Sequence, residues 1–242
     1  MRRGWRAVGA VLAAALVWAA SDELAWPARA FLVALLAVLP PLSVAQARAI
    51  GPEAALPRVP VYLSSAAALW VLGLLALGAG LGGGFTPRQL GLVAIAPVAA
   101  VGWTAALLGA AVALAAAWRA FGLAESAILL GLLPRTSVEK ALFVGLSLSA
   151  GVTEELVFRG FLVPALGAAT GLPWLAVALS AGAFGVVHAY QSAAGVVRAA
   201  LLGLILTVPF LVTGSLVPSM LAHFLYDALA GLWLADWLLG RR

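Results

Sequence analysis

The chain consists of apolar runs, most of them about 20 residues long, separated by short polar loops. A helix that crosses a bilayer needs about 20 mainly apolar residues. Hydrophobic residues make up 64% of the 242 residues and charged residues 10%, whereas soluble domains have about 45–50% and about 25%. The pattern therefore predicts an all-α, polytopic transmembrane helix bundle.

Eight membrane spans are expected. The Pro40-Pro41 pair should kink or break the second span, and the glycine-rich stretch 78–84 should form a turn after the third. The apolar piece 127–133 suits an interfacial or re-entrant segment. The first run begins like a signal peptide but has no convincing cleavage site, so we expect a retained anchor. The expected spans cover residues 5–20, 28–47, 60–80, 90–117, 138–167, 173–190, 194–213 and 215–238.

Charge placement predicts the orientation of the bundle. With eight spans, eleven of the fourteen basic residues fall on the side that holds both termini, and only Arg29 and Arg88 fall on the other. Loops rich in Lys and Arg stay in the cytoplasm, so both termini are expected there. The basic residues are scattered singly, which predicts membrane lipid as a partner and excludes nucleic acid. The Ala-, Gly- and Arg-rich composition is typical of a bacterial protein and hence of a bacterial plasma membrane.

Charged side chains interrupt the fifth apolar run. Glu154, Glu155 and Arg159 lie within six residues, although each charge at membrane depth costs about 2.5–3.5 kcal/mol. Glu155 and Arg159 are four residues apart on a helix and can pair. Glu154 lies about 100° further round the helix, where it could act as a general base. The alternative is a structural ion pair beside an acid that reaches toward water.

Both histidines of the chain lie in later apolar runs. Phe184 precedes His188 by four residues and shares its helix face, and Asp227 follows His223 at the same spacing. The Asp227 carboxylate could hold the His223 imidazole in one tautomer. Either histidine alone would suit helix packing equally well.

Together with the acids, the histidines predict a buried reaction centre. Such a set could activate water and stabilise an oxyanion, or it could hold zinc through a glutamate and two histidines. Either arrangement hydrolyses amides. The absence of cysteine excludes a disulfide, a thiol nucleophile and a cysteine-ligated metal.

Three motifs in this order resemble those of the CPBP family (CAAX prenyl protease and bacteriocin-processing), which are intramembrane endopeptidases. They read EELVFR at 154–159, FGVVH at 184–188 and HFLYD at 223–227. The resemblance covers residues 138–230 and implies about eight membrane helices with the site in a membrane cavity. We therefore expect one membrane domain over 1–242, with scaffold helices in 1–120 and the catalytic core in 138–230.

The resemblance also implies residue roles. Glu154 would activate the attacking water with help from His188. His223 and Asp227 would form or orient the side that stabilises the oxyanion. The family often has asparagine at the position of Asp227, and an ionised aspartate cannot donate a hydrogen bond. Asp227 would then be protonated, act through His223, or favour a cation.

Further residues complete the expected site. Glu155 and Arg159 would shape it, and Phe158 and Phe184 are candidates for the lining of the substrate cavity. Both a metal-dependent and a metal-free glutamate mechanism have been argued for the family, so the cofactor is left open. If a divalent metal such as zinc is present, its expected ligands are Glu154, His188 and His223.

The expected function is that of an intramembrane endopeptidase acting on a peptide or a membrane-protein substrate. The sequence contains none of the motifs HExxH, GxSG and GxGD, which mark other intramembrane protease designs. Two alternatives stay open. One is a non-catalytic membrane protein that binds a peptide, for example in immunity. The other is an ion-coupled transporter, which internal inverted repeats would favour.

Overall fold

The computed structural model describes residues 2–50, 56–123 and 126–233, and within these ranges it contains helices and no strand. The described residues up to 131 form six α-helices: α1 (Arg2–Ala19), α2 (Trp26–Val33), α3 (Leu39–Ile50), α4 (Arg58–Gly82), α5 (Pro97–Ala120) and α6 (Ala127–Gly131). The C-terminal half holds α7 (Ser137–Glu155), α8 (Val163–Thr170), α9 (Pro173–Val187), α10 (Ser192–Thr213) and α11 (Val217–Leu232). The predicted all-α class is confirmed.

In the described part of the chain, five continuous helical segments are long and apolar enough to cross a membrane. They are Trp26–Ile50, Arg58–Gly82, Pro97–Ala120, Ser137–Thr170 and Ala189–Thr213. A shorter apolar helix covers Pro173–Val187. The first and eighth expected spans correspond to α1 and α11, although the expected residues 234–238 lie outside the described part of the chain. The arrangement is compatible with about eight spans.

Two expectations about helix ends need correction. Of the two outcomes expected at Pro40-Pro41, a kink or a break, the break is wrong: the segment is helical from Trp26 to Ile50 and widens into a π-helix at Ala34–Val38 just before the prolines. Proline lacks the N–H that would bond to the carbonyl four residues earlier, and the wide turn absorbs that loss. The glycines from Gly78 onward stay in α4 up to Gly82, and the chain turns only at Gly83 and Gly84.

A second π-helix, Leu156–Leu162, lies inside the long segment that the sequence predicted as one regular helix. It ends one residue before Val163, and Pro164 follows at the start of α8. The Phe158 carbonyl accepts a hydrogen bond from the Ser180 hydroxyl of α9 at 2.6 Å. Isolated π turns are common at functional sites, and this one directly follows Glu155.

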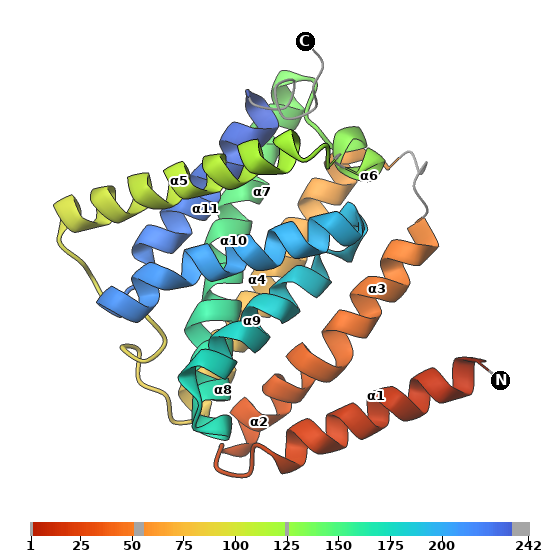
Figure 1. The fold of residues 1–242 in the computed structure, drawn as a ribbon, viewed down its shortest axis with the longest axis vertical. Helices are drawn as coiled ribbons and strands as arrows, with labels where there is room; N and C mark the ends of the chain where they lie inside the picture. The colour runs from red at the N-terminus through yellow and green to blue at the C-terminus, as the bar shows by residue number, and fades with distance from the viewer. Residues whose placement is uncertain (1, 51–55, 124–125, 234–242) are drawn as a thin grey trace.

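The helix α7 runs through the middle of the bundle, between α4 and α11 (Figure 1). The helix α9 packs against α8 and α10. The main contacts of α1 are with α2 and with the first π-helix. The hydrophobic core follows this pattern: its main cluster joins residues of α2, the second π-helix, α8 and α9. The C-terminal half therefore surrounds the point where α7 meets the second π-helix.

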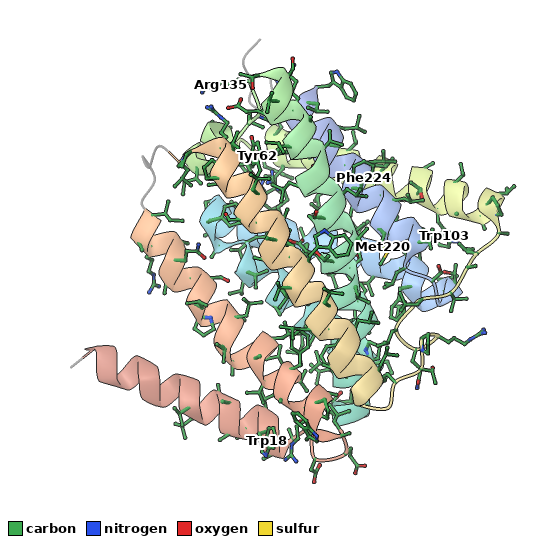
Figure 2. The ribbon with its side chains drawn as sticks, turned by 180° about the vertical axis from the view of Figure 1, so that it is seen from behind. Trp18, Tyr62, Trp103, Arg135, Met220 and Phe224 are labelled. Carbon is green, nitrogen blue, oxygen red and sulfur yellow. The ribbon has the colours of Figure 1, made fainter. Side chains whose placement is uncertain are left out.

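Gly151 lets α7 and α11 approach closely. A Cβ atom at this position would lie 2.7 Å from the Phe224 backbone nitrogen and 2.9 Å from the Met220 carbonyl oxygen. Both partners lie on α11, which runs beside α7 in Figure 2. Because backbone atoms cannot move aside as side chains do, this position requires glycine. The contact brings the end of α7 next to the middle of α11.

The loop between α4 and α5 closes over the second π-helix. The Leu216 backbone N–H donates to the Gly91 carbonyl at 2.9 Å, and the Ser215 hydroxyl donates to the Val93 carbonyl at 2.6 Å. A Cβ at Gly160 of the π-helix would lie 2.8 Å from the Leu90 carbonyl oxygen. This loop therefore ties the N-terminal half of the chain to the turn between α10 and α11.

The contact at Gly151 generates a stability prediction. We expect Gly151→Ala to lower the melting temperature measured in detergent, because overpacking costs about 1–3 kcal/mol. The matched control is Gly145→Ala in the same helix, where an added Cβ meets nothing within 4 Å. Alanine favours a helix over glycine, so the control should be neutral or slightly stabilising. Equal effects of the two substitutions would contradict a tight contact between α7 and α11.

Candidate active site

Four elements, α7, the second π-helix, α9 and α11, bring the polar residues of the three motifs together. Glu154 and Glu155 form the last turn of α7, and Arg159 lies in the second π-helix. His188 caps the C-terminal end of α9. The remaining two, His223 and Asp227, lie one turn apart on α11.

Glu154 faces both histidines. Its Oε2 lies 4.0 Å from His188 Nε2 and 3.8 Å from His223 Nε2. Among the described residues this oxygen is buried and has no hydrogen-bond partner. His223 Nε2 also lies 3.6 Å from Asp227 Oδ2. Two carboxylates and two imidazoles thus converge on one small volume.

Hydrogen bonds on the far side of each ring orient the imidazoles. His188 Nδ1 lies 2.7 Å from the Phe184 carbonyl oxygen, and His223 Nδ1 lies 2.7 Å from Glu155 Oε1. A carbonyl and an ionised carboxylate only accept hydrogen bonds, so both Nδ1 atoms carry the proton. Both Nε2 atoms therefore face Glu154, and each carries a lone pair when its ring is neutral.

The predicted pair of Glu155 and Arg159 is present and fully buried. Arg159 Nη1 donates to Glu155 Oε1 at 2.9 Å, and the two side chains are 1% and 0% exposed. Arg159 Nη2 donates to the Gly203 carbonyl of α10 at 3.0 Å. A Cβ at Gly203 would lie 3.3 Å from this same nitrogen, so glycine gives the guanidinium its place. The pair in turn supplies the oxygen that holds His223.

Phe158 and Phe184 lie beside these groups in the hydrophobic core. Both side chains are buried, and their rings meet edge to face with centroids 5.1 Å apart. The Phe184 ring lies 4.6 Å from the His188 ring, and the Arg159 guanidinium lies over it at 4.4 Å. Phe184 thus forms an apolar wall of the site. That the two rings line a substrate cavity stays a prediction.

The site opens on the side of Asp227. The Asp227 side chain is 37% exposed, whereas the side chains of Glu154 and His188 are only 15% and 14% exposed. Two surface hollows lie away from these side chains. One of about 350 Å³ is between α7 and α11 near Lys140, and one of about 400 Å³ is between α2 and α4.

The expected metal ligands were tested against this geometry. Imidazole and carboxylate groups suit zinc, but ligands at about 2.1 Å from a tetrahedral zinc ion lie about 3.4 Å apart. Glu154 Oε2 is farther than that from both Nε2 atoms. Within residues 2–50, 56–123 and 126–233, no three His, Cys, Asp or Glu are placed to hold a metal ion. The carboxylate and imidazole donors are of the kinds that bind zinc, but the distances between them are longer than those in a zinc site.

Sequence reasoning missed several residues near the site. Ser180 and Gly203 bond to the π-helix region from α9 and α10. Arg198, which the charge count placed with the cytoplasmic loops, is buried at 8% exposure within α10 and donates to Gln191 Oε1 at 3.2 Å. Its place inside the expected span 194–213 was the signal that could have identified it.

The arrangement combines a carboxylate oxygen that has no hydrogen-bond partner among the described residues, two oriented imidazoles and a partly open side. Such groups can remove a proton from water and stabilise a developing negative charge. No curated protein and no solved structure matches the chain. Residues 136–229 match the family described as Type II CAAX prenyl endopeptidase Rce1-like.

The matched range contains every polar residue of the candidate site. Together with the five helices that can cross a bilayer, the match identifies an integral membrane protein with an intramembrane protease type of function. The resemblance of the three motifs is thereby confirmed over residues 136–229, which match the model of the Rce1-like type II CAAX prenyl endopeptidases, a family that is the CPBP family.

Proposed function

We propose that this chain hydrolyses a peptide bond within or beside the bilayer, with Glu154 as the general base. The observation that carries the proposal is the position of Glu154 Oε2, which is buried, has no hydrogen-bond partner among the described residues, and faces the Nε2 atoms of His188 and His223. A gap of about 4 Å between acceptor atoms suits one bridging water molecule, since each hydrogen bond spans about 2.8 Å.

In the first step of the proposed reaction, Glu154 takes a proton from this water. His188, whose Nδ1 is held by the Phe184 carbonyl, accepts the second hydrogen bond of the water and orients it. The water oxygen attacks the carbonyl carbon of the scissile bond, and the carbonyl oxygen becomes an oxyanion. Protonated His223 donates its Nε2–H to that oxyanion.

In the second step the tetrahedral intermediate collapses. The bond between carbon and nitrogen breaks, and the leaving nitrogen takes the proton that Glu154 removed from the water. The products are a carboxylic acid and an amine, and the acid then passes its proton to the amine or to water. Asp227 acts through His223, because an ionised carboxylate cannot donate to an oxyanion and its Oδ2 lies 3.6 Å from the His223 Nε2.

The proposal extends to the placement of the protein. The substrate is a peptide or a segment of a membrane protein, and it enters from the side of Asp227. The chain lies in a bacterial plasma membrane with both termini in the cytoplasm, as the bias of basic residues favours. Residues 1–120 serve as scaffold, and 138–230 form the catalytic core.

The central test is cleavage of candidate peptides by purified protein in detergent or liposomes. We expect Glu154→Gln to lower kcat by about 10²–10⁴, because an amide cannot take a proton from water. Melting temperature should not fall, since Glu154 Oε2 has no partner to lose. The matched control is Glu23→Gln at an exposed position between α1 and α2. Cleavage by Glu154→Gln at the wild-type rate would refute the proposal and favour a peptide-binding role or a transporter.

The role of Glu155 and Arg159 in orienting His223 can be tested by comparing the stability of variants with their cleavage rates. We expect Glu155→Gln to destabilise the protein by about 3–5 kcal/mol, because it leaves Arg159 buried without a counter-charge. The double change Glu155→Leu with Arg159→Met removes both charges and should regain most of the melting temperature. It should not regain cleavage, since His223 Nδ1 then lacks its acceptor. A double variant with wild-type kcat would show that the pair does not orient His223.

Chelation tests the metal-free form of the proposal. We expect cleavage to persist after dialysis against a zinc chelator, because the spacing around Glu154 is wider than that of a zinc ligand set. Loss of cleavage, followed by recovery on addition of zinc, would instead make Glu154, His188 and His223 ligands. The measurement is kcat before and after chelation, with metal content determined on the same samples.

A further inference from the structure

The two imidazoles of the candidate site are not held with equal strength. His223 Nδ1 bonds to the Glu155 carboxylate, which is itself paired with the buried Arg159. His188 Nδ1 instead bonds to the neutral Phe184 carbonyl. Hydrogen bonds with an ionised partner are about twice as strong as neutral ones. The orientation of His188 therefore depends more on the groups that pack against its ring.

Two aromatic rings pack against the His188 imidazole. The centroid of the Phe184 ring lies 4.6 Å from that of the imidazole, and the centroid of the Tyr190 ring lies 6.0 Å from it at an interplanar angle of 33°. Aromatic pairs attract each other at centroid distances of about 4.5–7 Å. Phe184 is fixed by the packing of the hydrophobic core. Tyr190 belongs to a short 3₁₀ turn and is only half-buried, so its ring needs another hold.

The side-chain amide of Gln191 provides that hold. Its Nε2 donates to the Tyr190 hydroxyl oxygen at 3.0 Å, and its Oε1 accepts from Arg198 Nη2 at 3.2 Å. Because a guanidinium group only donates hydrogen bonds, the amide oxygen faces Arg198 and the amide nitrogen faces the phenol. Arg198 is buried within α10. One amide thus links the Tyr190 side chain to the interior of the helix bundle.

The backbone after His188 is shaped to keep Gln191 in this place. Ser192 has a φ of 84°, a value that non-glycine residues rarely adopt, and its hydroxyl accepts from the Gly195 N–H at 3.3 Å. A Cβ atom at Gly195 would lie 2.5 Å from Gln191 Cβ, so a larger residue there would displace the Gln191 side chain. Strained backbone conformations persist only where the surrounding structure imposes them, and they cluster at functional sites.

We propose that Tyr190 is a positioning residue, whose ring keeps the His188 imidazole turned with Nε2 toward Glu154. Gln191 and Arg198 act one step further away, because they hold the Tyr190 side chain. The inference rests on the hydrolysis proposed above, since it concerns the imidazole that orients the attacking water there. Without the Tyr190 ring the imidazole would rotate about its side-chain bonds, and its Nε2 lone pair would face the water for less of the time.

The first test needs no substrate. The chain has two histidines, so solid-state nitrogen NMR of histidine-labelled protein in liposomes gives two sets of imidazole signals, and a His223→Gln variant assigns them. In the wild type we expect His188 in one tautomer with the proton on Nδ1, and therefore one sharp pair of signals. Tyr190→Leu should broaden or split these signals and leave those of His223 unchanged. Phe121→Leu, at an exposed ring directly after α5, is the matched control.

The second test asks whether this orientation serves the reaction. On a peptide whose cleavage Glu154→Gln abolishes, we expect Tyr190→Leu to lower kcat about tenfold with KM nearly unchanged, because one aromatic contact is lost. Tyr190→Phe keeps the ring and loses only the acceptor for Gln191, so it should lower kcat about threefold. Gln191→Leu breaks the same hydrogen bond, and adding Tyr190→Phe to it should lower kcat no further. Gln46→Leu, at an exposed position of α3, is the matched control.

Each result decides a different statement. Unchanged His188 signals in Tyr190→Leu would overturn the positioning role, and altered signals with wild-type kcat would overturn its part in the reaction. Additive losses of kcat in the double variant would overturn the link through Gln191. If Tyr190→Leu does not fold, Tyr190→Phe decides the same question, because it should broaden the His188 signals to a smaller extent. If Glu154→Gln cleaves like the wild type, the proposed function fails, while the NMR comparison still decides whether Tyr190 holds the imidazole.

Discussion

A guanidinium group that is 1% exposed must find all its partners inside the protein, and Arg159 finds them on three different elements. Its partners are the Glu155 carboxylate of α7, the Gly203 carbonyl of α10 and the Phe184 ring of α9. Removing any one would leave a buried charge less well compensated. The ion pair therefore holds three helices in one arrangement and, through Glu155, sets the direction of the His223 ring.

The two adjacent glutamates have different surroundings, and this divides the chemistry between them. Glu155 is fully buried and bonded to Arg159 and His223. Glu154 has an oxygen with no hydrogen-bond partner among the described residues and is partly accessible. These surroundings favour a structural role for Glu155 and leave Glu154 for the proposed role of general base.

The π-helix makes this division possible. Leu156–Leu162 begins directly after Glu155 and carries Arg159. A wide turn changes the direction in which successive side chains leave the helix, and it releases the Phe158 carbonyl to the Ser180 hydroxyl. Gly160 lies within the π-helix and admits the Leu90 carbonyl, and Pro164, which follows the π-helix, lacks an N–H for a regular helix. The π-helix, the close packing at Gly160 and the candidate active site therefore lie at the same place in the structure.

The sequence by itself determined the all-α class, most helix positions to within a few residues, and the pairing of Glu155 with Arg159. These features depend on hydropathy and on spacing along one helix, which are local and periodic. Only the tertiary structure decided that Glu154 faces both histidines, that Glu155 and not Asp227 holds His223 Nδ1, and that Arg198 is buried beside the site. Such contacts join helices far apart in the chain. They depend on how closely the backbones approach at glycines such as Gly151, and no periodicity along one helix encodes that distance.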